Sequence, residues 1–216
     1  MPIRFLVFVL VAASFALRVA SADQGPSVSG PPNASEIAFV RAIQADLDKR
    51  FPTAVDAEKA GYFRYTNADD TGAISYANLA WTSSDIRHPS QLWYDKNGKL
   101  LGADFSVSSA GAAPRPHLFG VQPGRWVEFD EHVHYVAKDP KTGTLLYDKY
   151  VLVPAFDAAG GDAKHPTTAT LVKLHRLAST NEVVKVFYFP SIWDLIVWVK
   201  PNPKGAFADK NPLVTP

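Results

Sequence analysis

The pattern of apolar and polar residues changes character near position 61. Before this position, apolar residues recur every three or four residues, which is the spacing of one face of a helix. Ser35 is a suitable cap for a helix that begins at Glu36, and Thr53 is a suitable cap for a second, short helix that ends before Gly61. The predicted apolar face of the first helix consists of Ile37, Val40, Ile43 and Leu47.

Beyond position 61, short aromatic and β-branched runs are separated by turn residues, which is typical of strands. Asn97-Gly98 is the strongest turn signal and predicts a tight hairpin, and a glycine-containing turn at 139–143 predicts a second hairpin. A third helix is predicted over 167–178, after a loop at 155–166. The predicted strands are 62–65, 74–81, 91–95, 100–107, 127–137, 145–153, 183–190 and 192–199.

Together these elements predict an α+β fold. An antiparallel sheet is built from hairpins, and the N-terminal helices and the one late helix pack on it. Residues 23–34 are rich in Gly, Pro and Ser and are predicted to form a flexible spacer ahead of a single α+β domain, 35–216.

The first 22 residues have the features of a secretory signal peptide. Arg4 precedes an almost unbroken apolar run, 5–17, and small residues follow at 20–22, so cleavage is predicted after Ala22. An uncleaved anchor is the alternative, although the run is short for a bilayer. No later apolar stretch in the sequence approaches the length of a transmembrane helix. The expected location is therefore the periplasm or the medium.

Composition excludes several classes of function. The chain has no cysteine, which excludes disulfides, zinc–thiolate sites, iron–sulfur clusters and covalently attached c-type haem. Removal of Arg4 and Arg18 with the signal peptide would leave 20 basic and 21 acidic residues, so no basic excess indicates a nucleic-acid partner. There is also no Gly-x-Ser-x-Gly motif and no glycine-rich phosphate loop.

The densest group of reactive side chains lies at 126–135, which reads Trp-Val-Glu-Phe-Asp-Glu-His-Val-His-Tyr. Alternate side chains of a strand share one face. A continuous strand here would therefore carry two carboxylates and two imidazoles in a single row. The residues of that row are Trp126, Glu128, Asp130, His132 and His134.

Three interpretations of this row are open. His132 and His134 are candidate ligands of one divalent transition metal, with a third ligand from another element, for which His88 and His117 are candidates. Alternatively, the row lines a pocket that binds a small polar molecule. Finally, it is the solvent-facing side of a half-buried strand.

The carboxylates of the row have a part in the first two interpretations. Glu128 and Asp130 are the candidate ligand-binding residues, and Asp130 either binds a metal directly or orients His132. The sequence thus favours a binding protein without turnover. A metal-dependent hydrolase that uses His132 and His134, and a purely structural or interaction module, are the alternatives.

The end of the chain is distinctive. Residues 193–212 combine a Trp-containing strand with an Asn-Pro-x-Gly-x-Phe-Ala-Asp-x-Asn-Pro string and so resemble the closing segment of a family of exported bacterial proteins of unknown function. Shorter similarities precede it in order at 60–62, 76–78, 89–94, 98–100 and 118–120.

Two positions depart from this family's pattern. Ser75 stands where relatives often carry histidine, and Lys210 stands where they often carry tryptophan. The resemblance implies an exported globular protein and no particular reaction. Apolar residues on both faces of 192–199 independently predict a central strand, and Phe207 is predicted to anchor the segment that follows.

Overall fold

The computed structural model describes residues 27–68, 72–81, 85–110 and 113–214. The predicted signal peptide lies outside the described residues. The helices and strands, in chain order, are α1 (Ala34–Arg50), α2 (Ala54–Lys59), β1 (Phe63–Arg64), β2 (Ile74–Ala77), β3 (Gln91–Tyr94), β4 (Leu100–Ser108), β5 (Val127–Phe129), β6 (His132–Lys138), β7 (Leu145–Leu152), α3 (Val153–Ala158), α4 (Thr168–Lys173), β8 (Val183–Phe189) and β9 (Ile192–Trp198).

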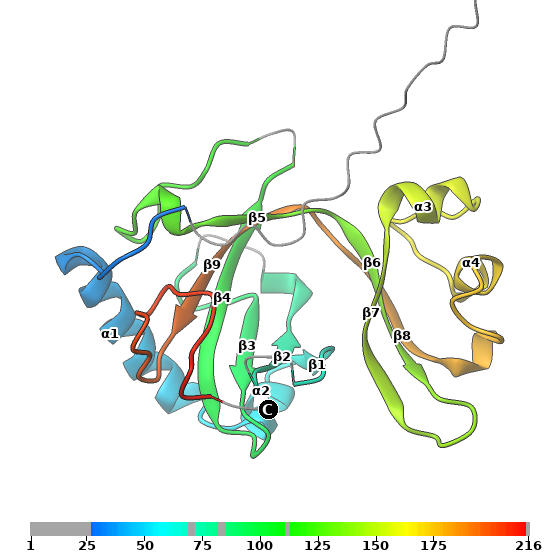
Figure 1. Ribbon diagram of the computed structural model, residues 1–216, viewed down its shortest axis with the longest axis horizontal. Coiled ribbons are helices and arrows are strands. Elements are labelled where there is room, and N and C mark those ends of the chain that lie inside the picture. The colour runs from blue at the N-terminus through cyan, green and yellow to red at the C-terminus, as the bar shows by residue number, and fades with distance from the viewer. Residues whose placement is uncertain (1–26, 69–71, 82–84, 111–112, 215–216) are drawn as a thin grey trace, which may run out of the picture.

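The strands form two antiparallel sheets, which confirms the predicted α+β class. The larger sheet has the order β1-β2-β3-β4-β9-β5, and the smaller has the order β7-β6-β8. Helix α1 lies along one face of the larger sheet, whereas α3 and α4 lie on the outer side of the smaller sheet (Figure 1). The inner face of the smaller sheet is therefore turned toward the larger sheet.

Helix α1 begins at a different cap from the one predicted. Asn33 forms a capping box with Glu36, because the Asn33 side chain accepts from the Glu36 amide and the Glu36 carboxylate accepts from the Asn33 amide. The Ser35 hydroxyl instead donates to the Gly120 carbonyl at 2.7 Å. The apolar face is shifted accordingly, so that Ile37 is exposed. The buried residues of α1 are Glu36, Phe39, Ile43 and Leu47.

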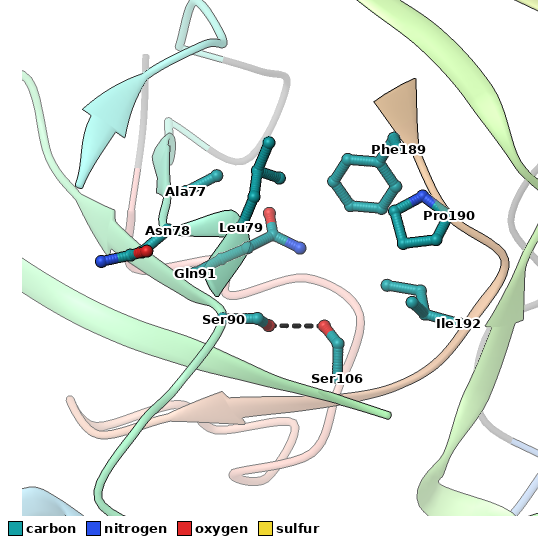
Figure 2. A pocket seen from close by; sticks show the side chains of 9 residues that line it. All are labelled: Ala77, Asn78, Leu79, Ser90, Gln91, Ser106, Phe189, Pro190 and Ile192. Atoms are coloured by element: carbon teal, nitrogen blue, oxygen red, sulfur yellow. Dashed lines mark hydrogen bonds between the residues drawn. The ribbon is translucent and has the colours of Figure 1, made fainter. Parts of the chain in front are cut away.

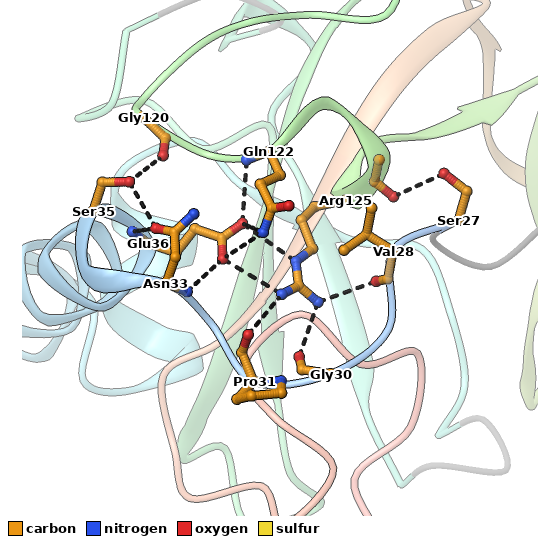
Figure 3. Close-up of polar contacts among 11 residues, drawn as sticks. Ser27, Val28, Gly30, Pro31, Asn33, Ser35, Glu36, Gly120, Gln122 and Arg125 are labelled. Atoms are coloured by element: carbon orange, nitrogen blue, oxygen red, sulfur yellow. Dashed lines mark hydrogen bonds and ion pairs between the residues drawn. The ribbon is translucent and has the colours of Figure 1, made fainter.

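The first described residues are held against the domain by Arg125 (Figure 3). Its Nη1 donates to the carbonyls of Val28 and Gly30 at 3.1 Å each, and its Nη2 donates to the carbonyl of Pro31 at 3.3 Å. The guanidinium also pairs with Glu36, with 3.2 Å between Nε and Oε1, and both side chains are buried. We call this group the Arg125 clasp. It fixes residues that the composition predicted to be a flexible spacer.

The first predicted hairpin is confirmed, with β3 antiparallel to β4, but its turn is longer than predicted. Gly98 has the expected positive φ of 73°, whereas Asn97 does not share it, and a two-residue Asn-Gly turn needs positive φ at both positions. The Asp95 carboxylate instead accepts from the amides of Asn97 and Lys99 at 2.8 Å each. A carboxylate-capped loop thus closes the hairpin.

The second half of the chain differs most from prediction. The predicted strand 127–137 is divided between β5 in the larger sheet and β6 in the smaller one. Helix α3 occupies part of the predicted loop 155–166, because Pro154 fixes a helical φ at its first turn and Phe156 is fully buried. Helix α4 covers only the first half of the predicted helix 167–178.

The end of the chain matches its predicted structural role. Strand β9 is central, between β4 and β5, and Phe207 is 2% exposed in the main core. The Trp198 indole donates to the Ala208 carbonyl at 2.7 Å, and Asn211 donates to the Pro201 carbonyl at 2.9 Å. No helix in the described ranges is long and apolar enough to cross a membrane.

Candidate ligand site at the junction of the two sheets

The predicted polar row is broken where the chain passes from one sheet to the other. Trp126 is fully buried in the main core, and Glu128 and Asp130 are exposed. Alternation along one strand therefore does not place them with the histidines, because Asp130 and Glu131 lie between two strands that belong to different sheets. The prediction of one continuous face was wrong for this half of the row.

The prediction that His132 and His134 share a face is confirmed, since their ring centroids are 5.7 Å apart. Each imidazole also stacks on the residue directly opposite it on β8, as cross-strand neighbours do. His132 stacks on Phe189 at 4.9 Å between centroids, and His134 stacks on Phe187 at 5.4 Å. The inner face of the smaller sheet thus presents two pairs of rings, with the two rings stacked within each pair.

Tyr65, just after β1, joins this face to the larger sheet. Its ring meets His134 edge-on, with centroids 5.0 Å apart. Its hydroxyl donates to the side-chain oxygen of Gln91 on β3. We use the name sheet junction for the six residues that make these contacts. They are Tyr65, Gln91, His132, His134, Phe187 and Phe189.

Burial sets the protonation states at the sheet junction. His134 is 5% exposed, and burial, with a smaller effect of the neighbouring His132, lowers its pKa to about 3. Its Nδ1 has no hydrogen-bond partner among the described residues. Burial also raises the pKa of Tyr65 well above its usual value of 10, and the negative charges of Asp104 and Asp194 act in the same direction. His134 is therefore neutral and Tyr65 keeps its proton.

His132 is oriented by the backbone. Its Nδ1 lies 2.9 Å from the Asp130 carbonyl oxygen. A carbonyl oxygen only accepts hydrogen bonds, so the hydrogen in this contact lies on Nδ1 of His132. Imidazoles that bind metals are commonly oriented in this way.

The predicted third metal ligand is not found. In the part of the chain that the structure describes, no group of three His, Cys, Asp or Glu side chains is placed to hold a metal ion. His88 pairs with the Asp85 carboxylate at 2.9 Å and contacts Trp81, while His117 is exposed in a loop. Neither completes a set with His132 and His134, which alone form an incomplete donor set for a tightly bound divalent metal.

A recess opens beside the sheet junction (Figure 2). The empty volume of the recess, including the part that is open to solvent, is about 250 Å³. Asn78, Ser90, Gln91 and Ser106 provide its polar lining, and the Asn78 amide is bonded to the backbone of Ala60 and Ala80. The apolar lining includes Leu79, Phe189 and Ile192. Because Gln91 and Phe189 belong to both, the recess directly adjoins the sheet junction.

Polar groups behind the recess form a hydrogen-bonded chain. The hydroxyl oxygens of Ser90 and Ser106 are 2.5 Å apart, and Ser106 donates to the Asp194 carboxylate at 2.6 Å. All three side chains are at most 6% exposed. Register explains the contact, because Ser106 on β4 lies directly opposite Asp194 on β9. Beside this chain, the Trp93 indole donates to the carboxylate of Asp104, also on β4, at 3.0 Å.

The sequence pattern did not lead to the prediction of these residues as part of a site. The available signal was a run of alternating polar positions, Asp104 and Ser106, inside an otherwise apolar strand, together with Asp194 in the apolar strand at the end of the chain. Polar side chains on one face of central strands indicate either a buried network or a site.

No family model, curated protein or solved structure matches this chain. The functional conclusion therefore rests on the geometry of the site.

Proposed function

We propose that this protein is an exported binding protein that holds a small polar ligand, without turnover, at the sheet junction and its recess. The observation that carries the proposal is the Nδ1 atom of His134, which is buried and has no partner among the described residues. An unpaired buried polar atom costs about 1–3 kcal/mol. A partner from outside the polypeptide would remove that cost.

The surroundings of His134 suit a ligand better than they suit a solvent-facing strand. The imidazole is 5% exposed and lies between Tyr65 and Phe187. The adjoining recess combines apolar walls with a few fixed polar groups, which is the usual make-up of a small-molecule site. On a solvent-facing strand the His134 side chain would be accessible to water, whereas it is buried.

Export is supported by the signal-like start of the chain and by the resemblance of 193–212 to exported bacterial proteins. Intact-mass measurement of the exported protein should place its first residue within two positions of Asp23. Recovery of a chain that still begins at Met1 would contradict export with cleavage.

A metal-dependent hydrolase is the second candidate. The observation that favours it is the orientation of His132 by the Asp130 carbonyl, next to a second imidazole on the same face. It also requires a third ligand, which the described residues do not provide. We therefore rank it below ligand binding.

The test follows the ring nitrogens of His134 by NMR in the untagged mature protein during separate titrations with glycerol, glucose, urea, acetate and ethylammonium. Binding at the sheet junction should shift these signals saturably with at least one probe. In calorimetry, the variant His134→Phe should bind that probe at least tenfold more weakly, whereas His165→Phe, the same exchange at an exposed loop position, should bind normally.

Two results would contradict the proposal. One is the absence of a saturable response of His134 to every probe. The other is stoichiometric binding of Zn²⁺, Ni²⁺, Cu²⁺ or Mn²⁺ in calorimetry that is lost in both His132→Ala and His134→Ala, which would favour the hydrolase instead.

A further inference from the structure

We propose that the recess receives a hydroxyl group, so that the ligand is a neutral hydroxylated compound of the polyol or sugar class. This inference rests on the proposed function and adds the chemical class of the ligand. It follows from the donors and acceptors that remain available in the recess after the internal hydrogen bonds are assigned.

Gln91 supplies the donor. Tyr65 keeps its proton and donates it to the side-chain oxygen of Gln91, which fixes the orientation of the amide and leaves its NH₂ group as the available end. Figure 2 shows this nitrogen pointing across the recess, on the side of Phe189 and Ile192. Gln91 is 6% exposed, so its amide is a rigid, desolvated donor.

Ser90 supplies the acceptor. Ser106 has one proton and gives it to Asp194, so in the 2.5 Å contact with Ser90 it can only accept. The single proton of Ser90 is thereby used inside the protein, toward Ser106 or toward the Asp104 backbone carbonyl at 3.2 Å. The Ser90 oxygen keeps its lone pairs, and it lines the recess.

One donor and one acceptor match a hydroxyl group, which accepts through its oxygen and donates its hydrogen. The enclosed part of the recess has room for about one water-sized group, and a hydroxyl is of that size. A carboxylate would face the Ser90 oxygen with the Asp194 carboxylate behind it. An ammonium group can only donate and would meet the N–H groups of Gln91.

The apolar walls can hold the carbon skeleton of the ligand. Leu79, Phe189 and Ile192 line the recess, and Leu79 is 39% exposed. The Phe189 ring stacks on His132 and also borders the recess. A ligand with a hydroxyl in the recess can therefore place its carbon skeleton against these apolar side chains.

The experiment compares three small probes of similar size, ethanol, acetate and ethylammonium, and adds glycerol as a fourth, all at neutral pH. The readout is the shift of the Gln91 side-chain amide in ¹H–¹⁵N spectra of the full mature protein. Ethanol and glycerol should shift it saturably in the millimolar range, and the two ions should not.

Ser90→Ala is the matched variant, because it removes the acceptor and leaves the Ser106–Asp194 bond in place. It should weaken glycerol binding about tenfold, the loss of one hydrogen bond. Ser108→Ala, the same exchange at the exposed end of β4, should have no effect. Gln91→Met keeps the length of the side chain and removes the donor, so it should abolish the preference for hydroxyl probes, read at the Trp93 indole.

Three outcomes would overturn the inference. The first is an equal or larger response to acetate or ethylammonium, and the second is hydroxyl binding that Ser90→Ala leaves unchanged. The third is a response of His134 to another probe with no response of Gln91 to any hydroxyl, which would leave the proposed function intact. Silence of both residues toward all probes would overturn the inference and the proposed function together.

Discussion

At the scale of single residues, His134 has the most unusual environment. It is nearly inaccessible to solvent, lies against two aromatic rings and has a pKa lowered to about 3 by burial and by His132. The unfolded chain would titrate near 6.5. Between these two values the unfolded state binds a proton that the folded state does not.

Stability should therefore fall as the pH drops from about 6.5 toward 3, and it should not depend on His134 above that range. At pH 5 the loss from this residue is about 2 kcal/mol relative to pH 7. Denaturant unfolding at pH 7 and pH 5 gives the loss of unfolding free energy for wild type and for His134→Phe, which lacks the titrating group. The difference between these two losses is the contribution of His134.

The same variant gives a second readout at pH 7. Phenylalanine fits among the surrounding rings and removes the unpaired nitrogen, so His134→Phe should unfold at an equal or higher denaturant concentration than wild type. A variant that is markedly less stable at pH 7, or equally sensitive to pH, would contradict the proposed environment of His134.

Strand alternation predicted part of this environment. It placed His132 and His134 on one face, because both lie within β6. It could not identify Phe187, because strand pairing between β6 and β8 sets that contact. It could not identify Tyr65 either, because that contact depends on how the two sheets meet.

At the scale of elements, local signals predicted the hairpins and the two N-terminal helices, but they missed α3 and failed where tertiary structure decides. The break at Asp130 is one example, because apolar alternation continues across it while the chain changes sheets. The β3–β4 turn is another. Gly98 was identified correctly, whereas the role of the Asp95 carboxylate in closing the loop was not.

Gly98 offers a test of this turn. Replacing it with valine should cost about 1 kcal/mol or more, because β-branched residues tolerate positive φ poorly. Crowding adds little, since a Cβ there would lie 3.6 Å from the Ala54 side chain. Gly98→Asn is the matched control and should cost less, because asparagine tolerates this conformation. Equal stability of Gly98→Val and wild type in denaturant unfolding would rule out the assigned turn.

At the scale of the whole molecule, the two sheets meet through an apolar cluster, and buried polar contacts hold the start of the described chain. The Arg125 clasp connects residues 28–31 to α1 through Glu36. Composition suggested flexibility for this stretch, since Gly, Pro and Ser carry no signal for a distant arginine. The position of residues 28–31 depends on Arg125, which lies 94–97 residues later in the chain.

Arg125→Met should destabilise the protein by roughly 3–5 kcal/mol, because it leaves the Glu36 carboxylate buried without its partner. The double variant Glu36→Gln/Arg125→Met should lose less than the sum of the single variants. Lys59→Met, which breaks an exposed ion pair with Asp56, should change stability little. Additive losses in thermal unfolding would show that the clasp is not a coupled unit.

The most direct test of the central claim, that the sheet junction holds a small molecule, is native mass spectrometry of the protein prepared without an affinity tag. The His134→Phe variant is prepared in parallel. We predict that the wild-type chain carries one additional non-covalent small molecule, of the hydroxylated class, and that His134→Phe does not. Wild-type and variant chains that both show only the mass of the bare polypeptide would contradict the account.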